Sequence, residues 1–581
     1  MIRPFQGKDV SPHYATCIDI ETAPNGDVIG VGFAWGEQRQ YKSFENLDDW
    51  YHFYCSLLYS NRKYKELHKR LTRVYAHNGA NFDYLSFYTY FADKEEMLEG
   101  QYITADSAGI GVIAKLKRAN TVVTFLDSYR LLPQSLAKLG ETFNANVQKQ
   151  VVPPDCKNNY LKFKEKYPDM FWSYLRSDVL SIQEIIHSFW GTIYELFGNV
   201  GFLPMTLPAL VLRIFTKQIT EDIFTPHYDK LKQLERDAYK GGLTLCLKTG
   251  TFDNVNVYDV NSMYPSVMLT EEYPVSYMGY WSNEYDKTSM GLWRGTFNQS
   301  RQDLPPILFD HKNGATYSGS GVYTTNELNY LTSIGGTFTI TEGYVYTKTA
   351  PLFTRFIDKL YSLRKEAIEN GNDSLSYILK IMMNSLYGKF AQREDTDKIV
   401  LGKASEMVSM IDQGILFKIL GDWFIIPEHR EVQHCFVAIA TMITANARID
   451  LHRRMTSVIN QGNDVYYCDT DSIHTNGEYQ TSNDLGGIKL ENQGEAAYAG
   501  KKIYAFKGGK TRAKGIGRKI TKGELSYEVV AEIAHDKTKT VPITFEHFPS
   551  VKGVLGKKQN AAVITEMTRT LRNTGGIWDN E

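Results

Sequence analysis

Residues 465–475 read VYYCDTDSIHT, and the central string YCDTDS (467–472) places Asp469 and Asp471 in an otherwise apolar segment. The flanking residues predict a strand, a tight turn and a second strand. Two buried carboxylates without a partner are too costly, and a divalent cation such as Mg²⁺ would compensate their charge. Turns with two Asp residues are common, but the full string is expected by chance in only about one in thousands of chains of this size.

A second acidic segment, NVNVYDVNSMYP (254–265), predicts a strand that ends at Asp259 and runs into a turn. In isolation this Asp could equally be the N-cap of a helix. Taken together, Asp259 and Asp471 supply the ligands of a two-metal phosphoryl-transfer site, in which one ion activates a hydroxyl and the other holds a triphosphate.

A helical hairpin lies between these two segments. Residues 351–370 predict one helix and 375–391 the returning helix, with Gly371 as a C-cap and Asp373 or Ser374 as the next N-cap.

Basic residues of this hairpin are candidates for triphosphate binding. Lys380, Asn384 and Tyr387 follow the spacing i, i+4, i+7 and are expected on one face, and Arg364 on the preceding helix could point into the same space. A solvated charged face with a core tyrosine is the better interpretation of a lone Lys or Arg. The string KIMMNSLYG (380–388) makes it the minor interpretation here.

The N-terminal third predicts a separate α/β region. ATCIDIE (15–21), VIGVGFAW (28–35) and TVVTFLDS (121–128) read as strands, VYAHNGANFDYLSFY (74–88) as strand, turn and helix, and residues 171–197 as a long amphipathic helix. This region is expected to end near residue 195.

Four acids of this region form a second candidate metal site. Asp19 and Glu21 alternate on a strand and therefore share a face. Asp83 and Asp178 come from other elements, and Tyr174 lies one helical turn before Asp178. Four carboxylates in separate elements could bind two metals for hydrolysis. The alternative, four unrelated surface acids, fits poorly with the strand positions of Asp19 and Glu21.

Composition excludes several classes of protein. The 581 residues suggest roughly three or four domains, and the net charge of −1 argues against a generally basic DNA-coating protein. Six cysteines without a C-x-x-C pair disfavour a zinc site, an iron–sulfur cluster or a disulfide framework. No apolar run approaches the ~20 residues of a membrane span, and the N-terminus has no signal-peptide pattern, so a cytoplasmic protein without membrane contact is expected.

Residues 501–522 carry nine Lys or Arg residues and no acid, with Tyr504 and Phe506 interleaved. Such a run is usually a solvated face, but after a nucleotidyl-transfer motif it favours binding to a nucleic-acid backbone.

These strings resemble the motifs of the family B DNA polymerases. SMYP (262–265), KIMMNSLYG (380–388) and YCDTDS (467–472) are similar to motifs A, B and C in that order, with Met263 in place of the usual leucine. DIE, NxxxFD and YxxxD resemble the DEDD-type 3′–5′ exonucleases of proofreading polymerases. A YxGG string at 239–242 and a KxY string at 502–504 resemble the protein-primed branch, the phi29-type phage enzymes.

The resemblance implies roles for individual residues. For polymerisation it implies the metal ligands Asp259, Val260 and Asp471, the accessory carboxylate Asp469, the steric gate Tyr264 against a ribose 2′-OH, the nucleotide-binding residues Arg364, Lys380, Asn384 and Tyr387, and the DNA-binding residues Tyr239, Gly241, Gly242, Lys502 and Tyr504. For the exonuclease it implies the catalytic carboxylates Asp19, Glu21, Asp83 and Asp178, of which Asp19, Glu21 and Asp178 bind metal, the water-orienting Tyr174, and the strand contacts Thr22, Asn78, Phe82, Ser128 and Lys149. Tyr129 departs from the leucine that usually follows the serine.

The implied fold is a multidomain α/β chain, α+β overall. An RNase H-like 3′–5′ exonuclease domain (1–197) precedes a right-hand polymerase domain (198–581), whose parts are expected as palm (198–269 and 431–500), first terminal-protein-region insertion (270–350), fingers (351–391), second insertion (392–430) and thumb (535–581).

The implied function is template-directed DNA synthesis with proofreading, replicating a linear phage-type genome by protein-primed initiation and strand displacement. The implied cofactors are two Mg²⁺ ions per site, with Mn²⁺ able to substitute. The implied partners are primer–template DNA, dNTPs and a terminal protein, with the chain a monomer or a heterodimer with that protein in the host cytoplasm. Two alternatives stay open: a family B polymerase that starts from a nucleic-acid primer or from none, and, more remotely, a non-catalytic DNA-binding scaffold.

Overall fold

The computed structural model describes residues 1–94, 97–103, 108–147, 149–157, 159–311, 314–401, 404–420, 423–429, 431–517, 519–547 and 565–579. Parts of the expected insertions (312–313, 402–403, 421–422 and 430) and of the expected thumb (548–564 and 580–581) therefore lie outside the described residues.

The N-terminal region alternates strands and helices, as predicted. Its elements are β1 (Thr16–Thr22), β2 (Val28–Trp35), β3 (Gln40–Phe44), α1 (Leu47–Ser60), α2 (Lys65–Leu71), β4 (Arg73–Ala76), α3 (Asp83–Asp93), β5 (Met97–Ile103), β6 (Ala108–Leu116), β7 (Thr121–Asp127), η1 (Ser128–Arg130), α4 (Leu136–Thr142), η2 (Pro154–Cys156), α5 (Tyr160–Lys166) and α6 (Pro168–Phe197). The predicted strand at 28–35 matches β2 in both bounds. The long helix begins at Pro168 rather than at 171, because proline is well suited to the first helical turn.

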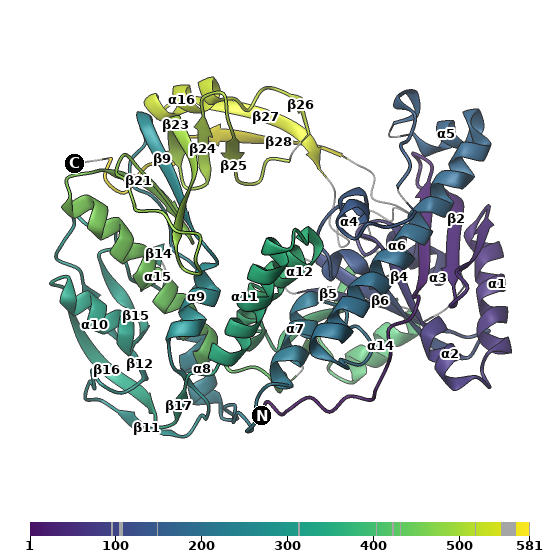
Figure 1. Cartoon of the computed structure of the whole chain (residues 1–581), viewed down its shortest axis with the longest axis horizontal. Helices are drawn as coiled ribbons and strands as arrows, with labels where there is room; N and C mark the ends of the chain where they lie inside the picture. The colour runs from purple at the N-terminus through teal and green to yellow at the C-terminus, as the bar shows by residue number, and fades with distance from the viewer. Residues whose placement is uncertain are drawn as a thin grey trace.

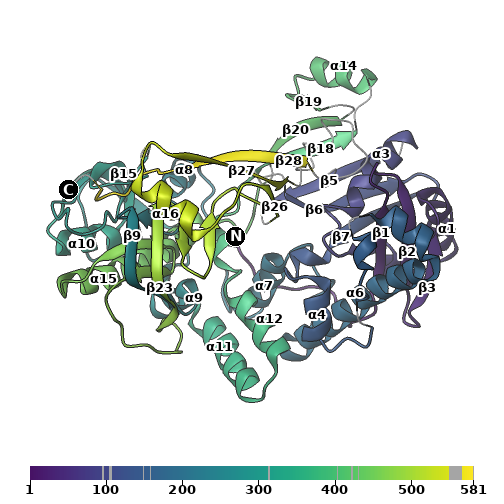
Figure 2. The same ribbon diagram turned by 90° about the horizontal axis from the view of Figure 1, so that it is seen from above.

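The second insertion does not form a unit of its own. Its elements are β18 (Asp395–Leu401), α14 (Ala404–Asp412), β19 (Lys418–Leu420) and β20 (Trp423–His429). Strand β18 pairs antiparallel with β5 of the N-terminal region. The result is one ten-stranded sheet of order β19-β20-β18-β5-β6-β7-β4-β1-β2-β3 (Figure 2). The sequence placed this segment as an insertion but did not predict its pairing with β5.

A seven-stranded sheet forms the centre of the polymerase region, in the order β25-β24-β23-β9-β22-β21-β8. Its strands and neighbouring helices are α7 (Leu207–Thr216), α8 (Asp229–Ala238), β8 (Thr244–Cys246), β9 (Gly250–Val260), α9 (Met263–Thr270), α15 (Val437–Asn460), β21 (Val465–Asp469), β22 (Ser472–Thr475), β23 (Ile488–Gly500), β24 (Ile503–Phe506) and β25 (Thr511–Ala513).

The first insertion packs on α15 at the outer side of this sheet (Figure 1). A four-stranded sheet of order β11-β16-β12-β15 carries most of it. Its elements are β10 (Tyr273–Pro274), β11 (Gly279–Ser282), β12 (Gly291–Asn298), β13 (Phe309–Asp310), β14 (Gly314–Ala315), β15 (Ser318–Thr324), α10 (Thr325–Ser333), β16 (Thr337–Tyr346) and β17 (Thr349–Ala350). At the C-terminal end, β26 (Ile520–Lys522), β27 (Thr540–His547) and β28 (Thr565–Arg572) form a three-stranded sheet beside α16 (Tyr527–His535).

The helical hairpin is α11 (Thr354–Glu369), α12 (Asp373–Met383) and the short α13 (Tyr387–Phe390). The single returning helix predicted over 375–391 is therefore wrong. The helix ends at Met383, where Asn384 is the C-cap and its side-chain amide donates to Lys380 O at 2.9 Å. Side chains that bond to the backbone in this way compete with helix continuation.

The predicted caps of the hairpin are each displaced. Asn372, not Asp373 or Ser374, is the N-cap of α12, because its side chain accepts a hydrogen bond from Leu375 N. Asn370 is the C-cap of α11, and Gly371 follows it with φ of +65°, a conformation that glycine adopts without strain.

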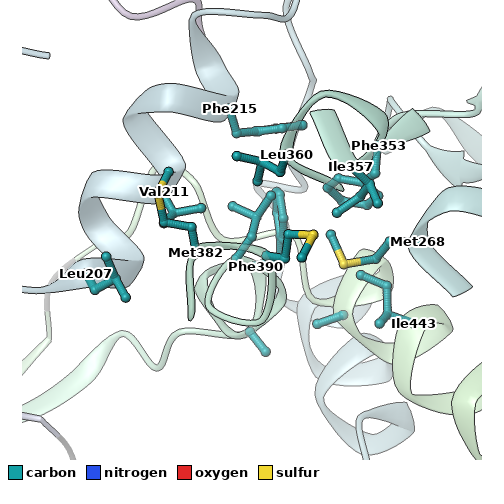
Figure 3. Packing of buried hydrophobic residues seen from close by; sticks show 14 of the residues in the cluster. Leu207, Val211, Phe215, Met268, Phe353, Ile357, Leu360, Met382, Phe390 and Ile443 are labelled. Atoms are coloured by element: carbon teal, nitrogen blue, oxygen red, sulfur yellow. The ribbon is translucent and has the colours of Figure 1, made fainter. Parts of the chain in front are cut away.

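An apolar cluster fixes the base of the hairpin to the rest of the chain (Figure 3). Phe215 of α7 contacts Phe353 and Phe390, with ring centroids 5.3 Å and 5.9 Å apart. Met268 of α9 and Ile443 of α15, from the helices beside the seven-stranded sheet, complete the cluster. The hairpin thus extends from a fixed base between the two large sheets (Figure 1).

None of the described helices is long and apolar enough to span a membrane.

Candidate active sites

The carboxylates of YCDTDS lie at the turn between β21 and β22, as predicted. Asp469 pairs with Ser472, and Asp471 N donates to Asp469 O at 2.7 Å. Thr470 has φ of +64°, which is uncommon for any residue with a Cβ and strained for a β-branched one. Such strained conformations persist where the surrounding structure holds them and cluster at functional sites.

The YxGG segment packs against this turn. A Cβ on Gly242 would lie 2.7 Å from side-chain atoms of Thr470, whereas a Cβ on Gly241 would meet nothing within 4 Å. Thr470 N also donates to Leu243 O at 2.7 Å. Close packing therefore explains the glycine at 242, but not the one at 241.

A buried arginine anchors the same segment. Arg448 of α15 donates to Lys240 O and to Gly241 O, both at 2.8 Å, and pairs with Glu327 in the first turn of α10. The Arg448 and Glu327 side chains are 0% and 1% exposed. Burial alone would raise the pKa of Glu327, but Arg448 and Lys240 outweigh it and leave that pKa below its ordinary value. This ion pair ties the first insertion to the YxGG segment.

Asp259 and Asp471 approach each other across neighbouring strands. Asp259 is the last residue but one of the central strand β9 and pairs with Ser472, and Val260 N donates to Asp471 O at 2.8 Å. Burial, followed by the charge of Asp259, raises the pKa of Asp471 to about 6. Burial also raises the pKa of Asp259. Two half-buried carboxylates, one of which raises the proton affinity of the other, form a site that favours a cation.

Asp469 has other partners and is set apart from this pair. Thr244 Oγ1 donates to its carboxylate at 2.8 Å, and the Lys502 ammonium lies 3.2 Å from it. Tyr504, which completes the KxY string, packs on Tyr467 with ring centroids 5.2 Å apart. The carboxylate of Asp469 therefore faces the lysine of the KxY string, and its accessory role stays a prediction.

Sequence reasoning missed two charged residues beside Asp259. Lys489 Nζ lies 3.7 Å from Asp259 Oδ1 and 3.0 Å from Glu491 Oε1. Lys489 and Glu491 are spaced i, i+2 in β23, the strand that follows the YCDTDS hairpin. This spacing was the only signal in the sequence, and it belongs to no motif that was recognised.

Aromatic and basic side chains from α9 and the hairpin complete the polymerase site. The Tyr264 and Tyr387 rings are 4.3 Å apart between centroids. Lys380 is exposed at the end of α12 and close enough for its charge to lower the pKa of Asp259, against the larger effect of burial. Arg364 is half-buried with its Nε lacking a hydrogen-bond partner. Asn384 is a helix cap, so the predicted common helical face for Lys380, Asn384 and Tyr387 does not exist.

Glycines in β2 allow the exonuclease carboxylates to meet. A Cβ on Gly30 would lie 2.9 Å from Phe171, and one on Gly32 would lie 2.8 Å from Val179. Helix α6 therefore packs closely on β1 and β2. This contact brings Asp178 of α6 towards the carboxylates of β1.

The four predicted acids do lie together. Burial raises the pKa of Asp19 and Glu21 well above the ordinary range, and the other carboxylates add to the shift. Asp83 accepts a hydrogen bond from Ile20 N at 2.7 Å, and burial raises its pKa to about 7. Burial likewise raises the pKa of Asp178. The alternative of four unrelated surface acids is therefore wrong.

Lys149 reaches this group. Its ammonium donates to the Tyr174 hydroxyl at 3.0 Å and pairs with Asp178. Lys149, which the sequence predicts as a strand contact, therefore lies directly beside the acidic group.

The expected strand contacts differ in exposure. Phe82 is 43% exposed, and Thr22 and Asn78 are half-buried. Ser128 is 3% exposed, and its hydroxyl donates to Ala76 O and contacts a ring nitrogen of His77 at 3.0 Å. Ser128 is therefore bonded within the protein, whereas Phe82 is on the surface.

Asp127 was not predicted. It is fully buried, and its carboxylate accepts hydrogen bonds from Asn78 N at 2.8 Å and Tyr129 N at 3.0 Å. It thereby holds Asn78, whose φ is +62°, in a left-handed conformation. Its place at the end of an apolar strand, like that of Asp259, was the signal that could have identified it.

The donor sets of both sites suit a hard divalent cation. Asp19 Oδ2 and Asp178 Oδ1 are buried without a hydrogen-bond partner, which leaves carboxylate oxygens for a cation to bind. Among the described residues, no group of three or more His, Cys, Asp or Glu side chains has the geometry to hold a metal ion. Mg²⁺ often uses only one or two carboxylates together with substrate phosphates and water, so Asp259 with Asp471, and Asp19 with Asp178, fit it.

Comparison with known proteins finds polymerases. A family described as DNA polymerase type B, organellar and viral, matches residues 63–172 and 160–484. The DNA-directed DNA polymerase of Enterobacteria phage PRD1 is 27% identical over 509 residues, which are 84% of this chain and 82% of the relative. A probable DNA polymerase of Podospora anserina is 26% identical over 449 residues, but the matched part is only 36% of that protein.

Among solved structures, phi29 DNA polymerase complexed with primer–template DNA and incoming nucleotide substrates superposes with a TM-score of 0.70 at 18% identity. The match covers 96% of this chain and 100% of the other. The predicted multidomain fold is thereby confirmed.

Proposed function

The chain belongs to the organellar and viral type B DNA polymerases. We propose that it copies a DNA template and removes mispaired nucleotides from the 3′ end of the new strand. We also propose that it begins synthesis on a hydroxyl group of a terminal protein. The observation that carries polymerisation is the proximity of Asp259 on β9 to Asp471 in the β21–β22 turn, close to Lys380 of the basic hairpin.

The chain's own residues position the reactants at the polymerase site. Asp259 and Asp471, with the neighbouring Val260 as a further ligand, would hold the divalent cations, which when bound would activate the primer hydroxyl and neutralise the triphosphate. Lys380 and Arg364 bind the triphosphate from the hairpin, an arrangement that acts by positioning and charge compensation. Asn384 shapes the end of the helix that carries Lys380.

Tyrosines and the KxY lysine hold the nucleic acid. The packed Tyr264 and Tyr387 rings form a platform for the nascent base pair, and Tyr264 excludes a ribose 2′-OH. Lys502 contacts the primer strand while its ammonium also neutralises Asp469. Tyr239 and the glycines that follow it contact the template.

The exonuclease site cleaves the 3′ end by hydrolysis. Asp19, Glu21 and Asp178 hold the cations, and Asp83 completes the acidic group. Tyr174, which receives a hydrogen bond from Lys149, orients the attacking water. Mg²⁺ is the proposed ion at both sites, and Mn²⁺ can replace it.

Two reciprocal variants test the two activities. Asp471→Asn should abolish extension of a primer–template while 3′–5′ degradation of the same primer continues, and Asp178→Asn should do the reverse. Extension by Asp471→Asn at the wild-type rate would refute the polymerase site. Wild-type protein that extends no primer with either Mg²⁺ or Mn²⁺ would instead favour a non-catalytic scaffold.

Protein priming rests on the resemblance of the YxGG and KxY strings to the phi29-type branch and on the two insertions. Incubation with the terminal protein of the same replicon, dATP and Mg²⁺ should give a covalent protein–nucleotide adduct. Extension of a DNA primer by the same preparation without any adduct would show a polymerase that starts from nucleic acid.

A further inference from the structure

Lys489 occupies a position opposite the catalytic carboxylate Asp259. The two residues are direct partners across strands β9 and β23, so their side chains leave the sheet on the same face. Lys489 Nζ lies 3.7 Å from Asp259 Oδ1. A positive charge is therefore already present beside a carboxylate that has to bind a divalent cation.

A second partner for this lysine lies on the same strand. Lys489 Nζ is 3.0 Å from Glu491 Oε1, closer than it is to Asp259. The register of β23 against β9 shifts between Leu490 and Asn492, which makes Glu491 the extra residue of a β-bulge. Bulges of this kind redirect a side chain beside an active site. Lys489 is 37% exposed and Glu491 46% exposed, so the lysine side chain has room to move between its two partners.

The charges around Asp259 do not balance. Asp259, Asp471 and Glu491 contribute three negative charges when ionised, whereas Lys489 in direct contact and Lys380 on the hairpin contribute two positive charges. In the metal-free protein Lys489 partly neutralises Asp259, and a dication that binds Asp259 and Asp471 would repel the ammonium. Glu491 can then keep the lysine without a change of strand pairing.

We propose that Lys489 is an internal counter-cation that competes with the divalent metal for Asp259, and that Glu491 receives its ammonium when metal binds. The pair sets the metal concentration at which the polymerase site is loaded, independently of the exonuclease site. This inference rests on the proposed polymerase metal site.

The test measures Mn²⁺ binding directly, by the loss of the free-ion electron paramagnetic resonance signal. The background protein carries Asp19→Ala and Asp178→Ala, so that the exonuclease site does not contribute. In this background Lys489→Met should tighten Mn²⁺ binding at the polymerase site about tenfold, the scale expected when one positive charge near a dication is removed from a partly screened site. Glu491→Gln should weaken it, because the lysine loses its alternative partner and returns to Asp259.

Lys248→Met is the matched control. Lys248 is 35% exposed, pairs with Asp464 at 2.8 Å and lies at the same large sheet, so this variant makes the same change in net charge away from Asp259. An affinity for Mn²⁺ in Lys489→Met within twofold of that in Lys248→Met would overturn the proposal. Lys489→Gln gives a second neutral variant in case Lys489→Met does not fold, and the same criterion applies to it.

Asp259→Asn separates this inference from the proposed function. If Asp259→Asn abolishes the Mn²⁺ site but Lys489→Met leaves its affinity unchanged, the counter-cation is refuted and the metal site stands. If Mn²⁺ binding survives Asp259→Asn, the metal site itself is wrongly placed, and the proposal about Lys489 falls with it. The Mg²⁺ concentration for half-maximal extension should fall in Lys489→Met in parallel with its Mn²⁺ dissociation constant.

Discussion

The buried Arg448–Glu327 pair offers the sharpest test of how the first insertion is held. Arg448→Met removes the guanidinium that contacts Glu327 and leaves this carboxylate fully buried, with its hydrogen bonds from Thr324 and the charge of Lys240 as its remaining support. Leaving one charge of a buried pair uncompensated costs about 3–5 kcal/mol. Lys240 O and Gly241 O lose their donors in the same variant, so the YxGG segment should loosen together with α10.

Hydrogen exchange of the amides of α10 measures this cost locally, which suits a multidomain chain whose global unfolding is not two-state. When the exchange rate is proportional to the equilibrium constant for local opening, a loss of 3–5 kcal/mol in the free energy of opening makes exchange roughly 100- to 5,000-fold faster. The double variant Arg448→Met/Glu327→Gln removes the stranded charge and should recover at least half of the loss.

Arg301→Met is the control for the loss of an arginine. Arg301 pairs with Asp303 in the same insertion, but the two side chains are 45% and 59% exposed. Such a pair contributes only about 0–1 kcal/mol. If the amides of α10 exchange no faster in Arg448→Met than in Arg301→Met, the claim that the buried pair holds α10 to α15 is refuted.

Three other outcomes follow from the geometry. Gly242→Ala forces a methyl group against Thr470 and should cost about 1–3 kcal/mol of stability and weaken template binding in a gel-shift titration, whereas Gly241→Ala, with open space for its Cβ, should change neither. Tyr264→Val should raise incorporation of ribonucleotides relative to deoxyribonucleotides roughly 10- to 100-fold in single-turnover extension, and an unchanged ratio would exclude Tyr264 as the gate. In metal-free protein the folded pKa of Asp471, about 6, exceeds its ordinary 3.8, so its contribution to stability falls as pH rises from about 4 to 6. In denaturant titrations at pH 8, the free energy of unfolding of Asp471→Asn should therefore exceed that of wild type by about 1–3 kcal/mol. At pH 4 the two free energies of unfolding should be equal.

The parts of the fold that the sequence predicted are those where local pattern and tertiary context agree. β2 and the YCDTDS hairpin combine apolar alternation with turn residues, and both formed as expected. The hairpin at 354–390 shows the limit of this reasoning. Asn384 fits a helical spacing, yet its side-chain bond to Lys380 O ends the helix there, and spacing carries no information about that competition.

The carboxylates of both sites could be predicted because their short strings occur together and in the order of a known family, although only YCDTDS is specific by itself. Asp127, Lys489 and Glu491 were not, since their roles depend on strand register, which is non-local. Asp127 acts through Asn78 N, 49 residues earlier in the chain, and Lys489 faces Asp259 only because β23 pairs with β9.

The ten-stranded sheet has a consequence for dividing the chain. β18 and β20 come after the hairpin in sequence, yet they extend the exonuclease sheet through β5, and Ile399 and Ile425 are buried in the same apolar core as Ile18. A fragment that starts after residue 197 would carry β18 with its edge unpaired and these isoleucines exposed, the features that make strands aggregate. The proposed proofreading activity is therefore best removed by point substitution, because truncation would remove the strands and the apolar core on which β18 and β20 pack.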